Sequence, residues 1–378
     1  MKFKRLTKLI LYLLLFLGIT FSLSAPRFSQ VIESGYSTKL YYWTIRYYSL
    51  LTGLFPFSLA ELTVVCLIAF IIYRAGRAVI AFNKDKRDFF KGLLKKGVRL
   101  PIVMAVIYLV FNLMWGLNYN RMTFAEISGL PVEPVSVNEL AELAVQLTHK
   151  ANQLRGQVAG DDRGVMTLPD GIQDMFSRAQ LGYERAAAIY PELGGRYGRP
   201  KGVMLSHYWS YTGIGGAFFP FTAEANVNIN MPHFNLPSTT AHEMAHLRGF
   251  AREDEANYIA YLTCILHPDP DFQYSGAILA LTHTMNALHR YDTETWNKIR
   301  SQYSEGVNRD LRDWRDHIER YEGLVEQVSS SVNDTYLKAN RQEEGIHSYG
   351  RMVDLLLAEF RVSNHQPFTI HSKILSSG

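Results

Sequence analysis

Two histidines four residues apart, with a glutamate directly after the first, lie in the stretch STTAHEMAHLRGFAREDEANYIAYL, Ser238 to Leu262. On an α-helix, residues four apart lie on one face, so His242 and His246 can present two imidazole nitrogens to one ion. Glu243 then lies beside that face, within reach of a bound water. Zn²⁺ accepts neutral imidazole at about 2.0–2.1 Å, and three protein ligands leave a fourth position for water. The spacing therefore indicates a zinc site with Glu243 as general base.

The third ligand is expected from the next helix. Gly249 is a natural stop three residues after the second histidine, and a new helix is predicted to begin at Arg252 or Glu253. Glu253 would then face back toward the metal, while Asn257, four residues further on, shares its face and can hold a ligand in place. The alternative interpretation is a helix-turn-helix with solvated acids and a paired core histidine.

The segments HEMAH and EDEAN together resemble the gluzincin metallopeptidases, in which an HExxH helix is joined by a glutamate in a Glu-x-x-Ala-Asn/Asp setting on the next helix. This resemblance assigns the metal-binding glutamate to Glu253 and the following polar position to Asn257, whereas Glu255 fits less well. It implies a zincin-like fold and zinc-dependent peptide hydrolysis. HEMAHLRG also begins like the metzincin pattern HExxHxxGxxH, but the third histidine is replaced by Arg252, whose guanidinium cannot ligate zinc.

Three apolar runs in the first third of the chain are expected to be transmembrane helices, over about 9–25, 57–73 and 100–117. Tyrosine and tryptophan near their margins favour membrane spans over buried helices of a soluble core. The first run also has the form of a signal peptide with a cleavage site after Ala25. Because Pro26 follows that site directly, a retained helix is preferred.

The loop 74–99 carries nine basic residues against two aspartates, and loops this basic stay in the cytoplasm. A solvated face or a contact with lipid headgroups would explain the same charges. With the N-terminus inside, three spans place residues 121–378 outside the cytoplasmic membrane of a bacterial cell. A cleaved signal peptide followed by two spans gives the same orientation.

The composition from residue 121 onward is that of a soluble domain, predicted to be mainly helical α+β with a small β-sheet. Ser136 and Glu139 form a capping-box pattern at the start of an amphipathic helix. A second helical run is expected from Ile172 to about Tyr190. The balance of 39 Lys+Arg against 35 Asp+Glu argues against a nucleic-acid partner. Two distant cysteines, Cys66 and Cys264, imply no disulfide framework.

Two further stretches each leave two interpretations open. AEANVNINMP, just upstream of the zinc helix, is either an edge strand that aligns an extended peptide by main-chain hydrogen bonds or an ordinary strand of a small sheet. His347 and Tyr349, in IHSYGRMVDLL, are candidate donors to a developing oxyanion. Their alternative role is purely structural.

Over nearly its whole length the chain resembles an uncharacterised bacterial membrane family, catalogued as domain of unknown function 3810. The matching pieces are the apolar runs, WGLNYNR, HEMAHLRGFAREDEAN and NDTYLKANRQEEGIHSYGRMVDLL. The sequence predicts a multi-pass, membrane-anchored zinc metallopeptidase acting on a peptide or protein, with the lipid bilayer as its other partner. The alternatives are a non-catalytic zinc-containing envelope protein for binding or sensing, and a zinc amidase acting on cell-wall peptides. Glu243 argues against the first, because a purely structural zinc site needs no base.

Overall fold

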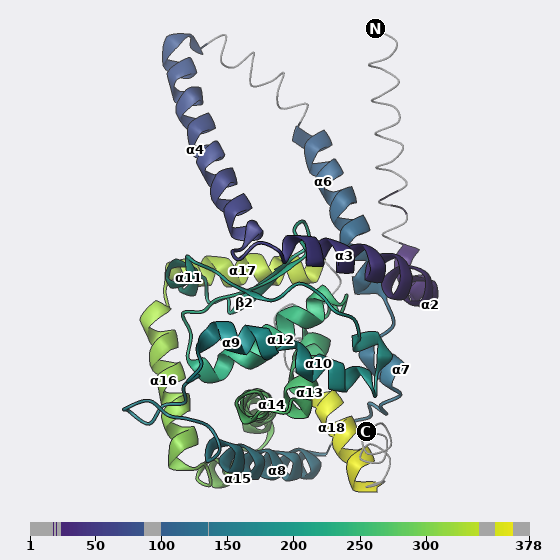
Figure 1. The fold of residues 1–378 in the computed structure, drawn as a ribbon, viewed down its shortest axis with the longest axis vertical. Coiled ribbons are helices and arrows are strands. Elements are labelled where there is room, and N and C mark those ends of the chain that lie inside the picture. Colours follow the sequence, from purple (N-terminus) through teal and green to yellow (C-terminus); the bar gives the residue numbers. More distant parts are fainter. Residues whose placement is uncertain are drawn as a thin grey trace.

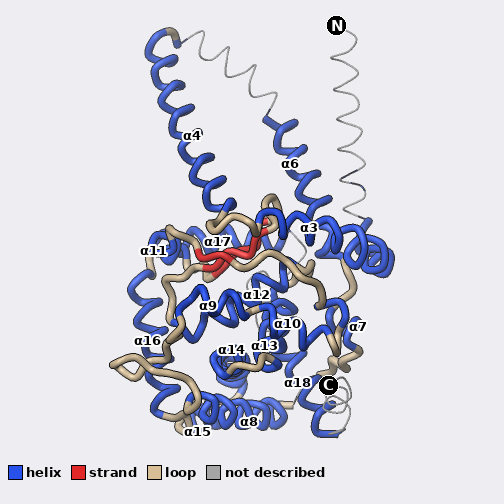
Figure 2. Tube along the Cα trace, in the orientation of Figure 1, coloured by secondary structure: helices blue, strands red, loops and turns tan. Residues whose placement is uncertain are grey.

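The computed structural model describes residues 24–86, 100–134, 136–339 and 352–365, together with positions 18 and 20. It has the mainly helical α+β architecture that the sequence predicts. Two helices, α4 (Leu59–Lys84) and α6 (Leu100–Met114), leave a helical body at the same end (Figure 1). The strands lie in the body, close to that end (Figure 2).

Most of the described chain is helical. Between α2 and α3 the chain forms a π-helix over Ile32–Tyr41, and short 3₁₀ turns occur at Ala25–Phe28, Gly116–Asn120, Pro191–Leu193, Ser210–Thr212 and His233–Asn235. The remaining helices are α2 (Ser29–Val31), α3 (Tyr42–Thr52), α7 (Phe124–Ser128), α8 (Val137–Arg155), α9 (Gly171–Arg178), α10 (Gln180–Ala187), α11 (Ser206–Trp209), α12 (Leu236–Leu247), α13 (Glu253–Leu266), α14 (Pro270–Tyr291), α15 (Thr293–Arg300), α16 (Glu305–Tyr321), α17 (Leu324–Ala339) and α18 (Met352–His365).

The sheet has three short strands in the order β1-β3-β2: β1 (Lys201–Gly202), β2 (Gly216–Phe219) and β3 (Glu224–Val227). β1 pairs parallel with β3, and β2 pairs antiparallel with it. The interpretation of AEANVNINMP as an edge strand is therefore wrong, because its strand β3 is central and fully buried. The edge nearer the histidine helix is β2, which lies in the segment KGVMLSHYWSYTGIGGAFFPF, whose β-forming residues and glycine turns indicate strands.

The core forms where α12, α13 and α14 pack on one another and where α14 packs on α8. Small residues at their contacts, including Ala245, Ala260, Ala277 and Ala280, are completely buried and let the helix backbones approach closely. The predicted capping box of Ser136 and Glu139 starts α8. Both cysteines are free, as expected. This packing gives α12 and α13, which carry the predicted ligands, a rigid support.

The expectation of three membrane spans needs correction. Among the described residues, α4 is the single helix long and apolar enough to cross a membrane, and none of its apolar window is buried. It continues to Lys84, well into the segment expected to be a loop. α6 ends at Met114 rather than at 117, because Trp115 to Asn120 turn into the body and are buried there. The first expected span, 9–25, lies almost entirely outside the described residues.

A buried ion pair joins α4 to the sheet. Glu224 of β3 accepts hydrogen bonds from the backbone N–H groups of Leu59 and Ala60, at 3.1 and 2.7 Å, in the first turn of α4. Lys201 of β1 forms an ion pair with Glu224 and donates to two backbone carbonyls of the segment before α4. A carboxylate at a helix N-terminus is stabilised by the helix dipole. The start of α4 is thus fixed to the sheet that borders the histidine helix.

Breaking this pair should destabilise the protein. Glu224→Gln leaves the buried Lys201 ammonium without its counter-charge, and removing one partner of a buried pair typically costs about 3–5 kcal/mol. We expect a clearly lower unfolding temperature for the full chain in detergent, followed by intrinsic fluorescence. The matched control is Glu294→Gln, which breaks the exposed pair with Lys298 and should leave the temperature nearly unchanged. Equal temperatures for the two variants would contradict this account of the junction.

Candidate metal centre

The turn after α12 is set by Gly249. Its φ of +86° lies in the left-handed region, which favours glycine. The N–H of Gly249 donates to the carbonyl of His246 at 2.9 Å, and the N–H of Phe250 donates to that of Ala245 at 3.2 Å. These two bonds make a Schellman motif, which ends the helix and reverses the chain. The predicted stop is confirmed, and α13 begins at Glu253 as expected.

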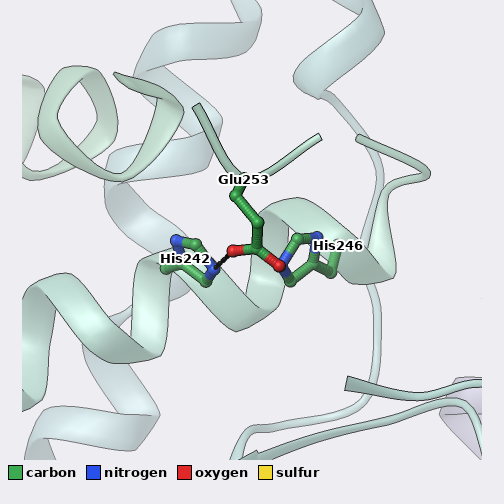
Figure 3. Close-up of side chains that lie close together, drawn as sticks. All are labelled: His242, His246 and Glu253. Atoms are coloured by element: carbon green, nitrogen blue, oxygen red, sulfur yellow. Dashed lines mark ion pairs between the residues drawn. The ribbon is translucent and has the colours of Figure 1, made fainter. Parts of the chain in front are cut away.

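The turn brings the three predicted ligands together. Figure 3 shows the Glu253 carboxylate between the two imidazoles of α12. Its Oε2 lies 3.1 Å from Nε2 of His242, and its Oε1 lies 3.6 Å from Nε2 of His246. One ligand atom from each residue lies within 4.8 Å of the others. All three side chains are largely buried, so the charge they carry is shielded from water.

The other ring nitrogen of each histidine is already engaged. Nδ1 of His246 lies 2.8 Å from the carbonyl oxygen of Phe250, which can only accept, so Nδ1 carries the proton. Nδ1 of His242 lies 2.9 Å from Oδ1 of Asn257, the residue predicted to hold a ligand. In the neutral rings the lone pair is therefore on Nε2, the atom that faces Glu253. Such outer partners fix the tautomer that binds a metal.

This arrangement fits a small cation. Two lone-pair nitrogens facing a carboxylate repel it unless a proton or a metal ion lies between them. Two ligand atoms that each lie about 2.0–2.1 Å from a tetrahedral zinc ion are themselves roughly 3.3 Å apart, close to the distances found here. The donor set of two imidazoles and one carboxylate is one that Zn²⁺ accepts. The residues present therefore fit a zinc ion in the type of their ligand atoms and in the two distances between the histidines and Glu253.

The same electrostatic interaction shifts the pKa values of His246 and Glu253. Burial alone would lower the pKa of His246, but the charge and hydrogen bond of Glu253, together with Glu243, raise it to about 9. Burial alone would raise the pKa of Glu253, and the two histidines outweigh it, so that this pKa falls far below its usual range. A proton on His246 thus supplies the positive charge that a metal ion would otherwise bring. Metal binding at neutral pH should release that proton.

Glu243 lies against the edge strand β2. A Cβ added to Gly216 would lie 2.5 Å from Oε1 of Glu243, so glycine is needed for the carboxyl group to fit there. Its other oxygen, Oε2, is buried and makes no hydrogen bond within the described structure. Burial raises the pKa of Glu243, partly offset by both histidines. A buried carboxyl oxygen without a partner, next to a ligand set, is suited to bind a water or a substrate proton.

A pocket of about 500 Å³ contains these groups, and aromatic residues that the sequence analysis missed form part of its wall. Trp115 meets the ring of His246 edge to face, with centroids 5.9 Å apart. The hydroxyls of Tyr119 and Tyr336 lie 3.1 Å apart, and both residues line the pocket. Trp115 and Tyr119 belong to WGLNYNR. The asparagines and the arginine at this end of the apolar run were the signal in the sequence that could have identified the segment as part of a site. Tyr336, in α17, carried no signal of its own.

The neighbouring charged residues have other partners. Glu255 accepts from the N–H of Phe124 and from Arg252, which leaves Glu253 as the acid that faces the histidines. His347 and Tyr349, the predicted oxyanion donors, lie outside the described residues. Tyr119 and Tyr336 are the tyrosines among the residues that line the described pocket.

Fold and site together define a mainly helical α+β protein with a helix long and apolar enough to cross a membrane and a candidate His-His-Glu metal centre. The chain belongs to the family described as protein of unknown function DUF3810, which it matches over residues 36–357. A search of curated proteins and a search of solved structures each find no match. The family assignment therefore brings no activity with it.

The ligand set makes a direct prediction. Glu253→Gln keeps the shape of the side chain but removes its charge, so zinc affinity should fall by at least the roughly 10–100-fold typical of losing a supporting partner of a metal ligand. Glu255→Gln is the matched control, because Glu255 is also a buried acid with charged and polar partners but does not face the histidines. This variant should keep one equivalent of zinc. His246→Ala should bind none, because two ligands do not close a stable site. Zinc is measured by mass spectrometry after competition with a chelator.

The unfolding temperature of each metal-free variant serves as the folding control. Full affinity in Glu253→Gln together with loss in Glu255→Gln would show that the wrong acid has been assigned.

Proposed function

We propose that this protein is a membrane-anchored zinc metallopeptidase, with its metal centre outside the cytoplasmic membrane of a bacterial cell. The observation that carries the proposal is the meeting of two Nε2 lone pairs, the Glu253 carboxylate and the unpaired Oε2 of Glu243 in one pocket. A structural metal site requires the first three groups and has no use for the fourth.

His242, His246 and Glu253 would hold the zinc ion, which would supply a Lewis acid for the peptide carbonyl and lower the pKa of bound water toward neutral pH. Glu243 accepts the proton of the attacking water at Oε2 and returns it to the nitrogen of the leaving amine. Because burial raises its pKa, this carboxylate is a stronger base and accepts the proton of the attacking water more readily. Asn257 and the carbonyl of Phe250 keep both imidazoles in the metal-binding tautomer.

The edge strand β2 supports a peptide as substrate. Gly216, Ala217 and Phe218 line the pocket, and β2 pairs on one side with β3. Its other edge is unpaired in the described sheet, and an extended peptide can add to such an edge by main-chain hydrogen bonds. We therefore assign the alignment of an extended peptide to β2, the strand before AEANVNINMP, rather than to AEANVNINMP itself. A backbone of Gly and Ala leaves room for the substrate chain.

The activity depends on Glu243 in a way that separates catalysis from metal binding. Glu243→Gln leaves the ligands untouched, so zinc content and unfolding temperature should stay near those of the wild type. Because general-base catalysis contributes about 10²–10⁴-fold, cleavage of a peptide that the wild type hydrolyses should fall at least a hundredfold. The assay is mass spectrometry of a peptide-library digest by the full chain, with a chelator control.

Undiminished cleavage by Glu243→Gln would contradict the mechanism. If the wild type binds zinc and cleaves no library peptide, the envelope protein for binding or sensing, or the cell-wall amidase, replaces the peptidase.

The proposed orientation follows from the basic loop 74–99. A reporter enzyme that is active only outside the cytoplasm should be active when fused after Gly378 and silent when fused at Lys91. A reporter that fluoresces only in the cytoplasm, fused at the same two positions, is the matched control and should give the reverse result. The opposite pattern in both would place the metal centre in the cytoplasm.

A further inference from the structure

The two acids of helix α17 lie on the wrong side for a helix that faces water, because Glu326 and Asp334 are on the half-buried face toward the body. The outward positions from Leu324 to Thr335 carry no charge, and the side chains of Leu324, Val328 and Val332 are 80%, 65% and 64% exposed. The exposed charge of the described helix is Lys338 in its last turn, which pairs with Asp334. Surface helices normally show the reverse pattern. The outward face of α17 therefore needs an apolar surrounding.

The preceding helix shows that this is a local feature. The exposed positions of α16 are mostly charged and include Arg312, Arg315, Asp316, Glu319 and Arg320. α16 and α17 are separated by two residues, and α16 runs along the side of the body (Figure 1). The change from a charged face to an uncharged one coincides with the position of α17 along the end of the body from which α4 and α6 leave (Figure 1).

Contacts at both ends of α17 place it at the base of these two helices. Tyr336, near its C-terminus, packs on the ring of Phe111 in the last turn of α6, with centroids 6.4 Å apart. Its N-terminal part packs on the 3₁₀ turn Ser210–Thr212, which directly follows α11. The segment that begins α11 is tied to α4, because Glu61 accepts hydrogen bonds from the N–H groups of Met204 and Leu205.

Helix α3 provides a second apolar surface at the same end (Figure 1). Its side chains Trp43, Tyr47 and Leu51 are 48%, 63% and 59% exposed, and the guanidinium of Arg46 lies 5.4 Å from the ring centre of Trp43. Tryptophan, tyrosine and arginine are residues that favour the boundary between lipid headgroups and acyl chains. α3 is followed by the apolar segment that leads into α4.

We propose that α17 and α3 lie in the headgroup region of the bilayer that α4 crosses, as an interfacial platform defined by the exposed faces of these two helices. The occupant of this surface is the lipid bilayer, because the platform continues directly from the anchor helix and surrounds its base. An amphipathic helix that lies in the interface buries its apolar face about 5–10 Å into that boundary. The uncharged face of α17 suits such burial.

The inner face of α17 lines the metal pocket through Asn333 and Tyr336. The pocket therefore lies one helix diameter, roughly 10 Å, from the bilayer surface. This second step rests on the proposed peptidase function: the substrate class is an extended polypeptide segment that directly adjoins a membrane anchor. A segment held at that height reaches β2 without leaving the membrane, whereas a free peptide must find the pocket from solution.

The placement of α17 can be measured without any activity. In a Cys66→Ser background, a fluorophore is attached at Val328→Cys or, as the control, at Tyr291→Cys, and the full chain is reconstituted into vesicles. Tyr291 is 73% exposed and directly precedes α15, at the opposite end of the body. Nitroxide-labelled lipids should quench the label at 328 several-fold more than the label at 291, and aqueous iodide should show the reverse preference.

Equal quenching at both positions would overturn the platform. Quenching at 328 by iodide alone, or ready disulfide cross-linking between two copies through that cysteine, would show that water or a second copy covers α17 instead. The Cys66→Ser protein without an added cysteine reports any labelling of the buried Cys264.

The substrate class needs a separate comparison in the same vesicles. One peptide sequence is presented free in solution and attached to a lipid anchor, and the double variant Val328→Asp, Val332→Asp is compared with the wild type. We expect at least tenfold faster cleavage of the anchored peptide by the wild type. The double variant should lose this preference and keep its rate on the free peptide. Equal rates for both peptides would refute the substrate class, whereas no cleavage of either would refute the peptidase and leave the depth measurement valid.

Discussion

The buried carboxylate of Glu253 faces two imidazole nitrogens, and this arrangement sets the requirements that the surrounding structure meets. Burying an acid is costly unless a positive charge compensates for it. The Schellman turn at Gly249 brings the acid to the histidines, and Asn257 together with the carbonyl of Phe250 turns both rings so that Nε2 faces inward. A positive charge at the centre, supplied by a proton or by a metal ion, resolves the electrostatic conflict, and the three side chains form a candidate metal-binding group.

The elements around the site belong to two different environments. α12 and α13 pack in the apolar core, whereas β2, Trp115 and α17 connect the pocket to the end of the body from which α4 and α6 leave. The buried pair of Glu224 and Lys201 fixes the start of α4 to the sheet. The candidate membrane-spanning helix, the unpaired edge of β2 in the described sheet and the pocket that contains the His-His-Glu group are thus linked over a few residues. This proximity supports a substrate that is itself close to the membrane.

Local patterns predicted the site, because its ligands depend on spacings within one short stretch. The four-residue spacing places His242 and His246 on one face of the helix, and Gly249 predicted the turn that positions Glu253. The wall of the pocket depends on contacts between distant segments, which a single sequence does not reveal. Tyr336 was missed because its partner Tyr119 is more than two hundred positions away. The end of α6 was predicted three residues too late, because the hydropathy of Trp115 is the same whether the side chain faces lipid or packs on the ring of His246.

The most direct test of the metal centre is X-ray absorption at the zinc edge on the full chain purified with zinc. The account predicts a first shell of nitrogen and oxygen only, at about 2.0–2.1 Å, with the outer scattering of two imidazole rings. In Glu253→Gln the carboxylate contribution should be lost while the imidazole scattering of any bound zinc remains. Sulfur ligands at about 2.3 Å, or a protein that retains no zinc, would contradict the assignment of His242, His246 and Glu253 as a zinc site.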